Sequence, residues 1–438
     1  RTREWFSGKR VTVMGLGLHG GGLATATWFL KHGARVIVTD RKTREQLALS
    51  VRTLERAAAR LPGKLTLVLG KHRASDFQHA DLIVQNPGVP WESEFLTIAK
   101  RAGVPIANDA SIALPILRAL PHPPRITAIT GTRGKSTTTA LIHAMLLAAG
   151  RTTFMAGNIR IPIFSVLDRI IAASHLQRSV KHSVFDTSGV DVVLELSSWQ
   201  CELLSRATGG PDIAVVTNLL PDHLNRYRDL RDYAAAKERL VRWAPVAILN
   251  PRNPWTKRMG KRAPGRVVWY PKTVRMPLAL PGVHNRENAA AAVAAARELD
   301  IPDRAIRKAL RSFRGLPGRC EVIARTSGVT FINDTCATTP DAVLAALDTL
   351  PARRVVLIAG GTDKKLEFAA WSRAVVKRVR TIVFIPGTAT DLMRAALARI
   401  HATIPAYEAD SMPIAVATAF AYAQRGDTVI LSSGATSF

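Results

Sequence analysis

The sequence predicts an α/β protein of three domains, each built on a doubly wound, mainly parallel sheet. Short apolar, β-branched segments alternate with helix-length segments along the chain, and two glycine-rich turns each follow an expected strand. At 438 residues the chain is also too long for a single core. Proline or glycine clusters at 121–124 and 313–318 interrupt this pattern. We therefore expect domains at 1–122, 123–315 and 316–438.

The first domain is expected to begin with a strand at 10–14, a glycine turn and a helix at 22–32. Gly15, Gly17 and Gly20 fit the G-x-G-x-x-G pattern, and Asp40 lies about 20 residues further on, where a dinucleotide fold places a ribose-binding acid. Alone, this pattern would indicate a nicotinamide-dependent oxidoreductase. It establishes only that a diphosphate can rest on a helix N-terminus. The further expected elements are strands at 35–39, 65–69 and 81–85 and a turn at 86–90.

A second glycine turn opens the central domain. The apolar segment 126–129 predicts a buried strand, the turn follows at 131–134, and residues 137–149 predict a helix. In this arrangement backbone N–H groups converge on an anion, Lys135 neutralises phosphate oxygens and the Ser136 hydroxyl can bind Mg²⁺. The match to the phosphate-loop pattern is incomplete, because its first glycine would stand at Ile129. The stretch nevertheless predicts an ATP site.

Polar residues follow the next two expected strands, 190–195 and 213–218. Glu195 ends the first, His223 comes shortly after the second, and together with Ser136 they could form a Mg²⁺ site at the sheet edge. The simpler alternatives are that Glu195 pairs with an arginine and that His223 caps the helix after Pro221. Lys237, in the expected helix 231–242, would by itself be a solvated lysine. The remaining expected elements are a strand at 247–250, a helix at 285–299, and strands at 329–333, 354–359, 381–385 and 428–432.

Composition limits the function classes. The chain is 47% hydrophobic and 21% charged, as in ordinary globular proteins, but 61 Lys and Arg against 33 Asp and Glu give a net charge of +28. The basic residues are spread along the sequence, and aromatics make up only 6% without a base-stacking pattern. We therefore expect phosphate-bearing substrates and no nucleic acid. A non-catalytic nucleic-acid-binding protein is the non-enzyme alternative, which would bind arbitrary DNA in a salt-sensitive way.

Cysteine usage and hydropathy indicate a cytoplasmic enzyme. Cys201, Cys320 and Cys336 are odd in number and form no CxxC pair, which favours a reducing compartment without disulfides. No apolar run approaches the roughly 18 residues of a membrane span, and no signal-peptide pattern opens the chain. Because the chain does not begin with Met, we expect a few N-terminal residues to be missing.

The motifs occur together in an order that resembles the Mur ligase family, and the resemblance covers essentially the whole chain. Its opening and closing motifs, 15–20 and 431–438, resemble the branch that adds D-glutamate. The other motifs that carry it lie at 130–137, 157–158, 195–200, 218–223, 284–288, 315–319 and 333–334.

The resemblance implies a Rossmann-like N-terminal domain that binds a UDP-linked substrate, a central P-loop ATPase domain, and a Rossmann-like C-terminal domain that brings the amino acid. The implied substrates are UDP-N-acetylmuramoyl-L-alanine, D-glutamate and ATP, joined through an acyl phosphate in peptidoglycan precursor synthesis. It further implies two Mg²⁺ ions, carbon dioxide carried as a carbamate on Lys237, and a monomer without membrane insertion.

The resemblance also assigns residues. Lys135, His223 and Lys237 would be catalytic, and Ser136, Glu195, His223 and the Lys237 carbamate would bind metal. ATP would contact Gly131, Thr132, Gly134, Lys135, Ser136, Thr137, Asn285, Asn288, Arg319 and Asp334. The UDP-linked substrate would contact Gly15, Leu16, Gly17, Leu18, His19, Gly20, Asp40, Arg41, Asn86, Pro87, Gly88, Asn158, Ser198 and Gln200. The amino acid would contact Thr338, Lys364, Ser437 and Phe438.

The chain departs from the family pattern at several positions. Cys336 stands where a lysine is common, so one fixed positive charge is missing, and Gly318 stands where a histidine is common. His19 replaces a small polar residue in the first glycine turn. The chain stops at Phe438, where the family continues, so we expect a truncated C-terminus. Other members of the family, folylpolyglutamate-type ligases and an L-glutamate-adding ligase stay open as alternatives.

Overall fold

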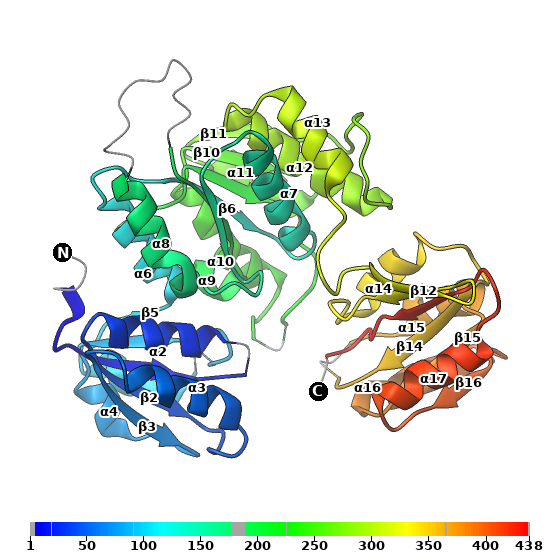
Figure 1. Ribbon diagram of the computed structural model, residues 1–438, viewed down its shortest axis with the longest axis horizontal. Helices are drawn as coiled ribbons and strands as arrows, with labels where there is room; N and C mark the ends of the chain where they lie inside the picture. Colours follow the sequence, from blue (N-terminus) through cyan, green and yellow to red (C-terminus); the bar gives the residue numbers. More distant parts are fainter. Residues whose placement is uncertain are drawn as a thin grey trace. The chain divides into compact units, whose positions relative to one another are not determined.

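The computed structural model describes residues 5–18, 20–90, 92–176, 189–224, 226–363 and 366–436. Its contacts divide the chain into two compact units. The first comprises residues 1–274 and 288–310 and holds two sheets, and the second comprises 275–287 and 311–438 and holds a third sheet (Figure 1). The three-domain α/β architecture with mainly parallel sheets is therefore confirmed.

The first sheet has five parallel strands in the order β3-β2-β1-β4-β5. The order reverses direction between β1 and β4, and open parallel sheets bind ligands at such a switch point, beyond the carboxyl ends of the strands. The strands are β1 (Arg10–Met14), β2 (Arg35–Asp40), β3 (Lys64–Leu69), β4 (Leu82–Gln85) and β5 (Ile106–Ala107). The helices are α2 (Gly21–Lys31), α3 (Ala48–Ala58), α4 (Ala74–Gln78), α5 (Glu94–Arg101) and α6 (Asp109–Arg118).

The second sheet has six parallel strands in the order β11-β10-β9-β6-β8-β7, with β6 between β9 and β8. The strands are β6 (Arg125–Thr130), β7 (Thr153–Gly157), β8 (Asp191–Glu195), β9 (Ile213–Val216), β10 (Val246–Leu249) and β11 (Arg266–Trp269). The helices are α7 (Lys135–Ala148), α8 (Ile163–Leu176), α9 (Ser198–Glu202), α10 (Leu230–Arg242), α11 (Pro254–Arg262), α12 (Val283–Glu298) and α13 (Asp303–Ser312).

The third sheet has the order β12-β13-β17-β14-β15-β16, and only its edge strand β12 runs antiparallel to its neighbour. The strands are β12 (Glu321–Thr326), β13 (Val329–Asn333), β14 (Val355–Gly360), β15 (Thr381–Ile385), β16 (Ala406–Glu408) and β17 (Thr428–Leu431). The helices are α14 (Pro340–Leu347), α15 (Ala369–Arg378), α16 (Thr388–Ala398) and α17 (Met412–Tyr422).

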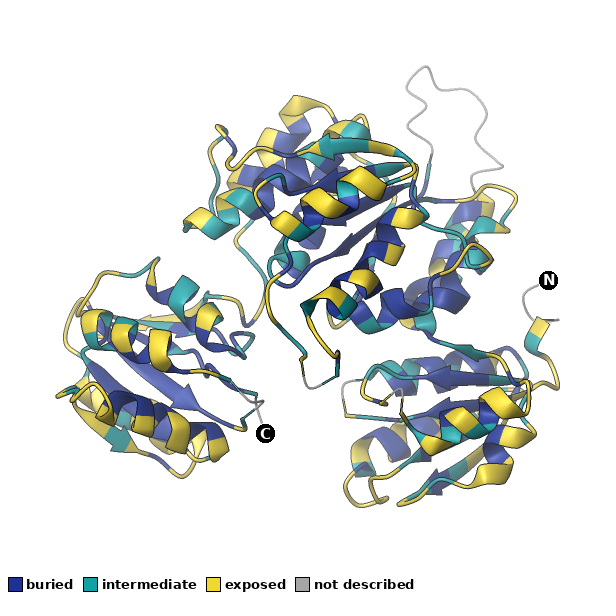
Figure 2. Cartoon of the chain, turned by 180° about the vertical axis from the view of Figure 1, so that it is seen from behind, coloured by how far each residue is buried: buried dark blue, intermediate teal, exposed yellow. Residues whose placement is uncertain are grey.

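The central strands are buried on both faces, whereas many helices expose an outer side (Figure 2). This explains why continuous apolar runs such as β6 and β8 were predictable. The edge strands β11, β12 and β16 are partly exposed, and the sequence analysis did not predict them. Among the described residues, no helix is long and apolar enough to cross a membrane.

Candidate active site

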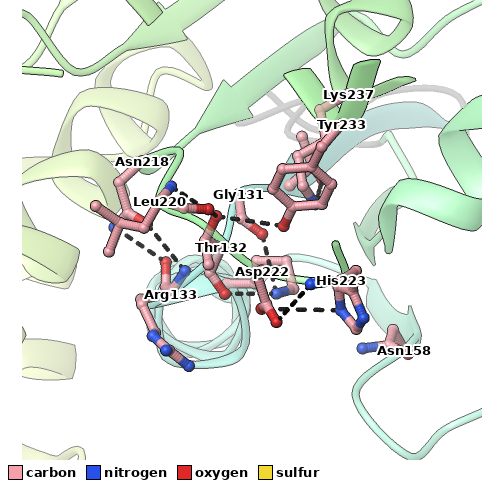
Figure 3. A network of polar contacts seen from close by, with 12 residues as sticks. Gly131, Thr132, Arg133, Asn158, Asn218, Leu220, Asp222, His223, Tyr233 and Lys237 are labelled. Atoms are coloured by element: carbon pink, nitrogen blue, oxygen red, sulfur yellow. Dashed lines mark hydrogen bonds and ion pairs between the residues drawn. The ribbon is translucent and has the colours of Figure 1, made fainter. Parts of the chain in front are cut away.

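The predicted phosphate loop joins β6 to α7. The helix begins at Lys135, and the Lys135 Nζ donates hydrogen bonds to the carbonyl oxygens of Gly131 and Thr132, both at 3.0 Å, so the ammonium lies over the loop. Asn218, which follows β9, stabilises the loop by accepting two of its backbone N–H groups. Its backbone oxygen accepts the Thr132 N–H at 2.8 Å and its Oδ1 accepts the Arg133 N–H at 2.9 Å (Figure 3).

Two glycines make this loop possible. Gly131 (φ 142°) and Gly134 (φ 80°) both adopt backbone conformations that disfavour side chains. A Cβ on Gly131 would overlap the Thr217 hydroxyl, and a Cβ on Gly134 would overlap the Asn288 amide. Asn288, near the middle of α12, is therefore brought against the loop from a segment 150 residues away, where its carbonyl also accepts the Thr138 hydroxyl.

Glu195 and His223 lie near the same end of the sheet as the loop. Glu195 pairs in register with Ile129 of β6, and Val216, at the end of β9, pairs with Thr130. The Glu195 side chain is buried. Its Oε1 accepts the Asn158 amide at 3.0 Å, whereas Oε2 has no hydrogen-bond partner among the described residues.

This donor set suits a metal ion that is partly held by nucleotide. The described residues contain no group of three or more His, Cys, Asp or Glu that could hold a metal alone. Mg²⁺ at nucleotide sites takes one or two protein oxygens and completes its shell with phosphate oxygens and water. A buried carboxylate oxygen without a partner on Glu195, beside a helix that begins with Lys135 and Ser136, fits that requirement.

Lys237 is the most unusual side chain of the site. It lies on the inner face of α10 with 1% of its surface exposed, and its Nζ donates to the Thr130 hydroxyl at 3.2 Å. The Nζ also lies 4.9 Å from the centre of the Tyr233 ring (Figure 3). Burial, and then the nearby Lys135 charge, lower the pKa of Lys237 to about 7. Lys237 is therefore an amine that can lose its proton near neutral pH.

His223 adopts a left-handed backbone (φ 55°), and its ring packs 5.4 Å from Trp199 and 6.1 Å from Tyr233. Asp222 lies beside it, with a carboxylate oxygen 3.8 Å from the His223 Nε2. The cap of α10 is Asp229, whose side chain accepts the Asp232 N–H. The imidazole is thus held between aromatic rings and does not cap α10.

The first glycine turn is closed by a carboxylate from its own domain. Asp40 Oδ2 accepts the N–H groups of Leu16 (2.9 Å) and Gly17 (3.1 Å), and Asn86 donates to the Gly15 carbonyl. The close packing of helix on turn falls at Gly22, where a Cβ would overlap the carbonyls of the turn. Asp40 therefore stabilises the glycine turn by accepting hydrogen bonds from two of its N–H groups. The predicted contacts Leu18, Gly20 and Arg41 flank these residues, and Pro87 and Gly88 lie in the turn after β4.

One pocket lies where the first two sheets meet. It is lined by Gln85, Asn86 and Pro87 from the first domain and by Trp199, Gln200 and Arg226, among others, from the central domain. Both polar atoms of the Gln200 side chain make hydrogen bonds within the protein. Its Oε1 accepts the N–H of Ser197, the N-cap residue of α9, and so completes a capping box. Its Nε2 donates to both carboxylate oxygens of Asp109 at 3.0 Å. Ser198, beside it, is buried.

The second unit carries further predicted contacts. Asp334 is buried, and its carboxylate accepts the Cys320 N–H at 3.0 Å and the Ser432 hydroxyl at 2.8 Å. Burial raises the pKa of Asp334. Gly318 (φ 70°) packs closely against the turn at Thr335 and Cys336. A Cβ at position 318 would lie only 2.8 Å from the Thr335 hydroxyl oxygen, so a side chain does not fit there. Arg319 is exposed and Thr338 is half-buried near this turn. Asn285, in the first turn of α12, donates to the carbonyl of Pro281, which precedes that helix.

Three family models match the chain. They are the N-terminal domain of MurD-like Mur ligases at residues 9–108, the Mur ligase middle domain at 129–273, and the Mur ligase glutamate ligase domain at 318–435. The UDP-N-acetylmuramoylalanine–D-glutamate ligase of Roseiflexus sp. is 36% identical over 470 residues, which cover 99% of this chain and 95% of that protein. The chain belongs to the Mur ligase family.

Other relatives agree with this membership. The UDP-N-acetylmuramoylalanine–D-glutamate ligase of Anaeromyxobacter dehalogenans is 36% identical, with 98% of this chain and 94% of that protein covered. Among solved structures, the UDP-N-acetylmuramate–alanine ligase of Thermotoga maritima has a TM-score of 0.62 at 20% identity, covering 98% and 96% of the two chains. An E. coli FolC structure has a TM-score of 0.55 at 20% identity over 74% of this chain and 89% of that one. At these identities the structures support the fold of this Mur ligase.

The three simpler sequence interpretations are wrong. Lys237 is buried, not solvated, because its position on α10 faces the sheet. His223 does not cap α10. For Glu195, the side-chain partner in the described residues is the Asn158 amide, not an arginine. The ligand-binding roles of all the predicted residues stay predictions. His19, Lys364, Ser437 and Phe438 lie outside the described residues.

Sequence reasoning missed residues that shape the site of this Mur ligase. Tyr233 covers the Lys237 amine and lies 3.2 Å from the Thr132 hydroxyl. The spacing of four between Tyr233 and Lys237 places both on one helix face and could have indicated the pair. Thr217, which donates to the Arg133 carbonyl at 2.6 Å, gives no comparable signal because their contact spans 84 residues.

We predict that Gly134→Ala damages both stability and ATP binding. The substitution forces a side chain into a left-handed conformation, which costs about 1–2 kcal/mol, and also pushes Asn288 away from the loop. Urea unfolding and ATP titration measure the two effects. Gly150→Ala is the matched control, because Gly150 has φ 77° but open space around its Cβ. It should lose about 1 kcal/mol and bind ATP normally. Equal ATP affinity in both variants would contradict the role of the Gly134–Asn288 contact.

We predict a pH-dependent gain of stability for Lys237→Met in CO₂-free buffer. The folded-state pKa, about 7, lies below the ordinary value of 10.5, so burial of the charged amine costs stability fully below pH 7. That cost declines as the pH rises from about 7 to 10.5. Lys237→Met should therefore unfold at a higher temperature than the parent at pH 6, and the difference should shrink toward pH 10. The control Lys308→Met, on the exposed face of α13, should show no such trend. A constant difference across this pH range would contradict the lowered pKa.

Proposed function

We propose that the protein uses ATP to join D-glutamate to UDP-N-acetylmuramoyl-L-alanine through an acyl phosphate, a step of peptidoglycan precursor synthesis. The observation that carries the proposal is the arrangement at the ends of β6, β8 and β9. A phosphate loop with Lys135 over it, a buried carboxylate at Glu195 and a buried amine at Lys237 lie at one end of the sheet. The names of relatives that match the whole chain support the choice of substrates.

The chain's own groups suit phosphoryl transfer to a carboxylate. Attack by the substrate carboxylate on the γ-phosphorus needs opposite charge at the transferring group, which Lys135 supplies from the loop together with the N–H groups at the start of α7. Ser136, Glu195, His223 and a modified Lys237 would hold Mg²⁺, which when bound screens the phosphate charges. The neutral glutamate amine would then attack the acyl carbon, and phosphate would leave and take up the amine proton. His223 would donate a hydrogen bond to the developing oxyanion.

We propose further that Lys237 carries carbon dioxide as a carbamate. Its neutral amine would attack the carbon of CO₂ and lose a proton to water, which would leave an anionic carboxylate on the lysine nitrogen. A pKa of about 7 and a buried position beside Thr130 support this, because the reaction requires the unprotonated amine. The carbamate would convert a buried cation beside Lys135 into an anion that offsets it.

The pocket between the first two sheets suits the sugar-linked substrate. It lies at the boundary of the first and central domains, and Asn86 both lines it and donates a hydrogen bond to the Gly15 carbonyl of the glycine turn. The diphosphate would rest at the Gly15–Gly20 turn, and the alanyl carboxylate would extend past Asn158 toward Lys135. Thr338, Lys364, Ser437 and Phe438 of the last domain would bind the incoming glutamate. We propose domain limits at 122/123 and 315/316 and a monomer that acts in the cytoplasm.

The test is product formation from a panel of amino acids. Purified protein with ATP, Mg²⁺ and UDP-N-acetylmuramoyl-L-alanine should release ADP with D-glutamate, and mass spectrometry should show a product heavier by one glutamyl residue. L-glutamate, L-alanine and diaminopimelate should release little ADP. Turnover with L-glutamate in place of D-glutamate would change the stereochemical assignment. Absence of ADP release with every amino acid would overturn the proposal.

A further inference from the structure

Folding gathers part of the protein's positive charge on one helix pair, although basic residues are spread along the sequence. On α10 every exposed position except Ala235 is an arginine, and on α11 every exposed position after Pro254 is cationic. The two helices are joined by an ion pair of 2.9 Å between Arg262 and Glu238. The neighbouring stripes form the α10–α11 basic face, which comprises Arg239, Arg242, Lys257, Arg258, Lys261 and Arg262.

The carboxylates of these two helices are already neutralised. Glu238 is buried against Arg262, and Asp232, at the first turn of α10, pairs with Arg228 at 3.6 Å. Within the described part of the chain, no hydrogen bond or ion pair is found for the side chains of Arg242, Lys257 and Lys261. These three side chains therefore present uncompensated cations to solvent on this face.

Two tryptophans accompany the cations. Trp255 lies in the first turn of α11, with the Arg258 guanidinium 4.8 Å from its ring centre. Trp269, at the end of the edge strand β11, is 44% exposed and packs against α11 at Gly260, where a Cβ would overlap its ring. Tryptophan beside lysine and arginine is typical of surfaces that rest at the headgroup level of a bilayer.

We propose that the α10–α11 basic face docks the protein on the surface of a bilayer that contains anionic lipid. Cations near such a surface are attracted by its negative potential, and the exposed Trp269 enters the interface. The inner side of α10 carries Lys237 and Tyr233, so the docking face lies on the opposite side of the helix from the candidate active site. This inference is independent of the proposed reaction. Nucleic acid fits the face less well, because Trp255 is covered by Arg258 and is not free to stack on a base.

The test is co-sedimentation of the full chain with vesicles of phosphatidylglycerol and phosphatidylcholine, and with phosphatidylcholine alone. The parent protein should bind only the anionic vesicles. A variant with Arg242, Lys257, Arg258 and Lys261 changed to Gln should bind several hundred-fold more weakly, about fivefold for each cation removed. The matched control changes four exposed cations of α13, Arg304, Arg307, Lys308 and Arg311, to Gln and should keep most of the affinity.

Two further measurements separate the alternatives. Lipids with brominated acyl chains should quench the fluorescence of the parent more than that of Trp269→Phe. Duplex DNA should bind more weakly than the anionic vesicles at equal salt. Equal losses in the α10–α11 and α13 variants would show that net charge alone binds lipid and would overturn the proposal. So would unchanged vesicle binding of the α10–α11 variant, or tighter binding to DNA that the same variant abolishes.

Discussion

Lys135→Ala is expected to lower the rate of ADP formation by about 10³-fold or more while the fold is retained. The Lys135 ammonium lies over the loop, where it donates hydrogen bonds to the carbonyl oxygens of Gly131 and Thr132. Its removal takes away charge stabilisation that is strongest when the γ-phosphoryl group is in transit. The effect should therefore appear in kcat more than in the KM for the sugar-linked substrate.

An ADP-release assay measures this effect, and circular dichroism with thermal unfolding checks the fold. Lys308→Ala, which removes an exposed lysine of α13, is the control for a general loss of charge and should leave kcat unchanged. Retention of turnover within a few-fold by Lys135→Ala would show that the loop does not hold the transferring phosphoryl group.

Lys237→Ala is expected to be nearly inactive, with a loss of similar size, and to be partly rescued by short carboxylic acids. Such an acid can enter the space left by the side chain and supply the oxygen pair that the carbamate would provide. The space that the Lys237 side chain would leave borders the Thr130 hydroxyl and the Tyr233 ring, so acetate and propionate should rescue better than bulkier acids.

A spectroscopic measurement keeps this prediction apart from simple misfolding. Parent protein in ¹³C-labelled bicarbonate should show a carbamate carbon signal that is absent from Lys237→Ala. The signal should weaken as the pH falls below about 7, because the amine is then protonated. Full activity of Lys237→Ala, or a parent spectrum without a carbamate signal, would remove carbamylation from the mechanism.

The strand, turn and helix that carry the phosphate loop could be predicted because they are encoded by one continuous stretch of sequence. A continuous apolar strand, a glycine turn and a helix start are encoded within 125–139, and the structure has β6, the loop and α7 there. Glu195 and His223 were predictable as strand-end residues because parallel strands bring their carboxyl ends to one edge. The sequence analysis did not predict β11 and β12, which are partly exposed edge strands.

The partners of these residues could not be predicted, since they come from distant segments. Spacing from the glycine turn suggests a ribose contact for Asp40, yet its carboxylate accepts N–H groups of the turn 23 and 24 residues earlier. Gln200 donates to Asp109, 91 residues away, and that contact ties the central domain to the first. The burial of Lys237 likewise depends on which face of α10 meets the sheet, and the alanines around it do not reveal that face.

The fate of one oxygen atom tests the central claim most directly. UDP-N-acetylmuramoyl-L-alanine labelled with ¹⁸O in its terminal carboxylate should, with ATP, Mg²⁺ and D-glutamate, transfer one ¹⁸O to each orthophosphate that is released. This follows because the carboxylate oxygen that attacks the γ-phosphorus leaves with the phosphate when the amine forms the amide. Unlabelled orthophosphate in the presence of a normal amount of amide product would contradict an acyl phosphate.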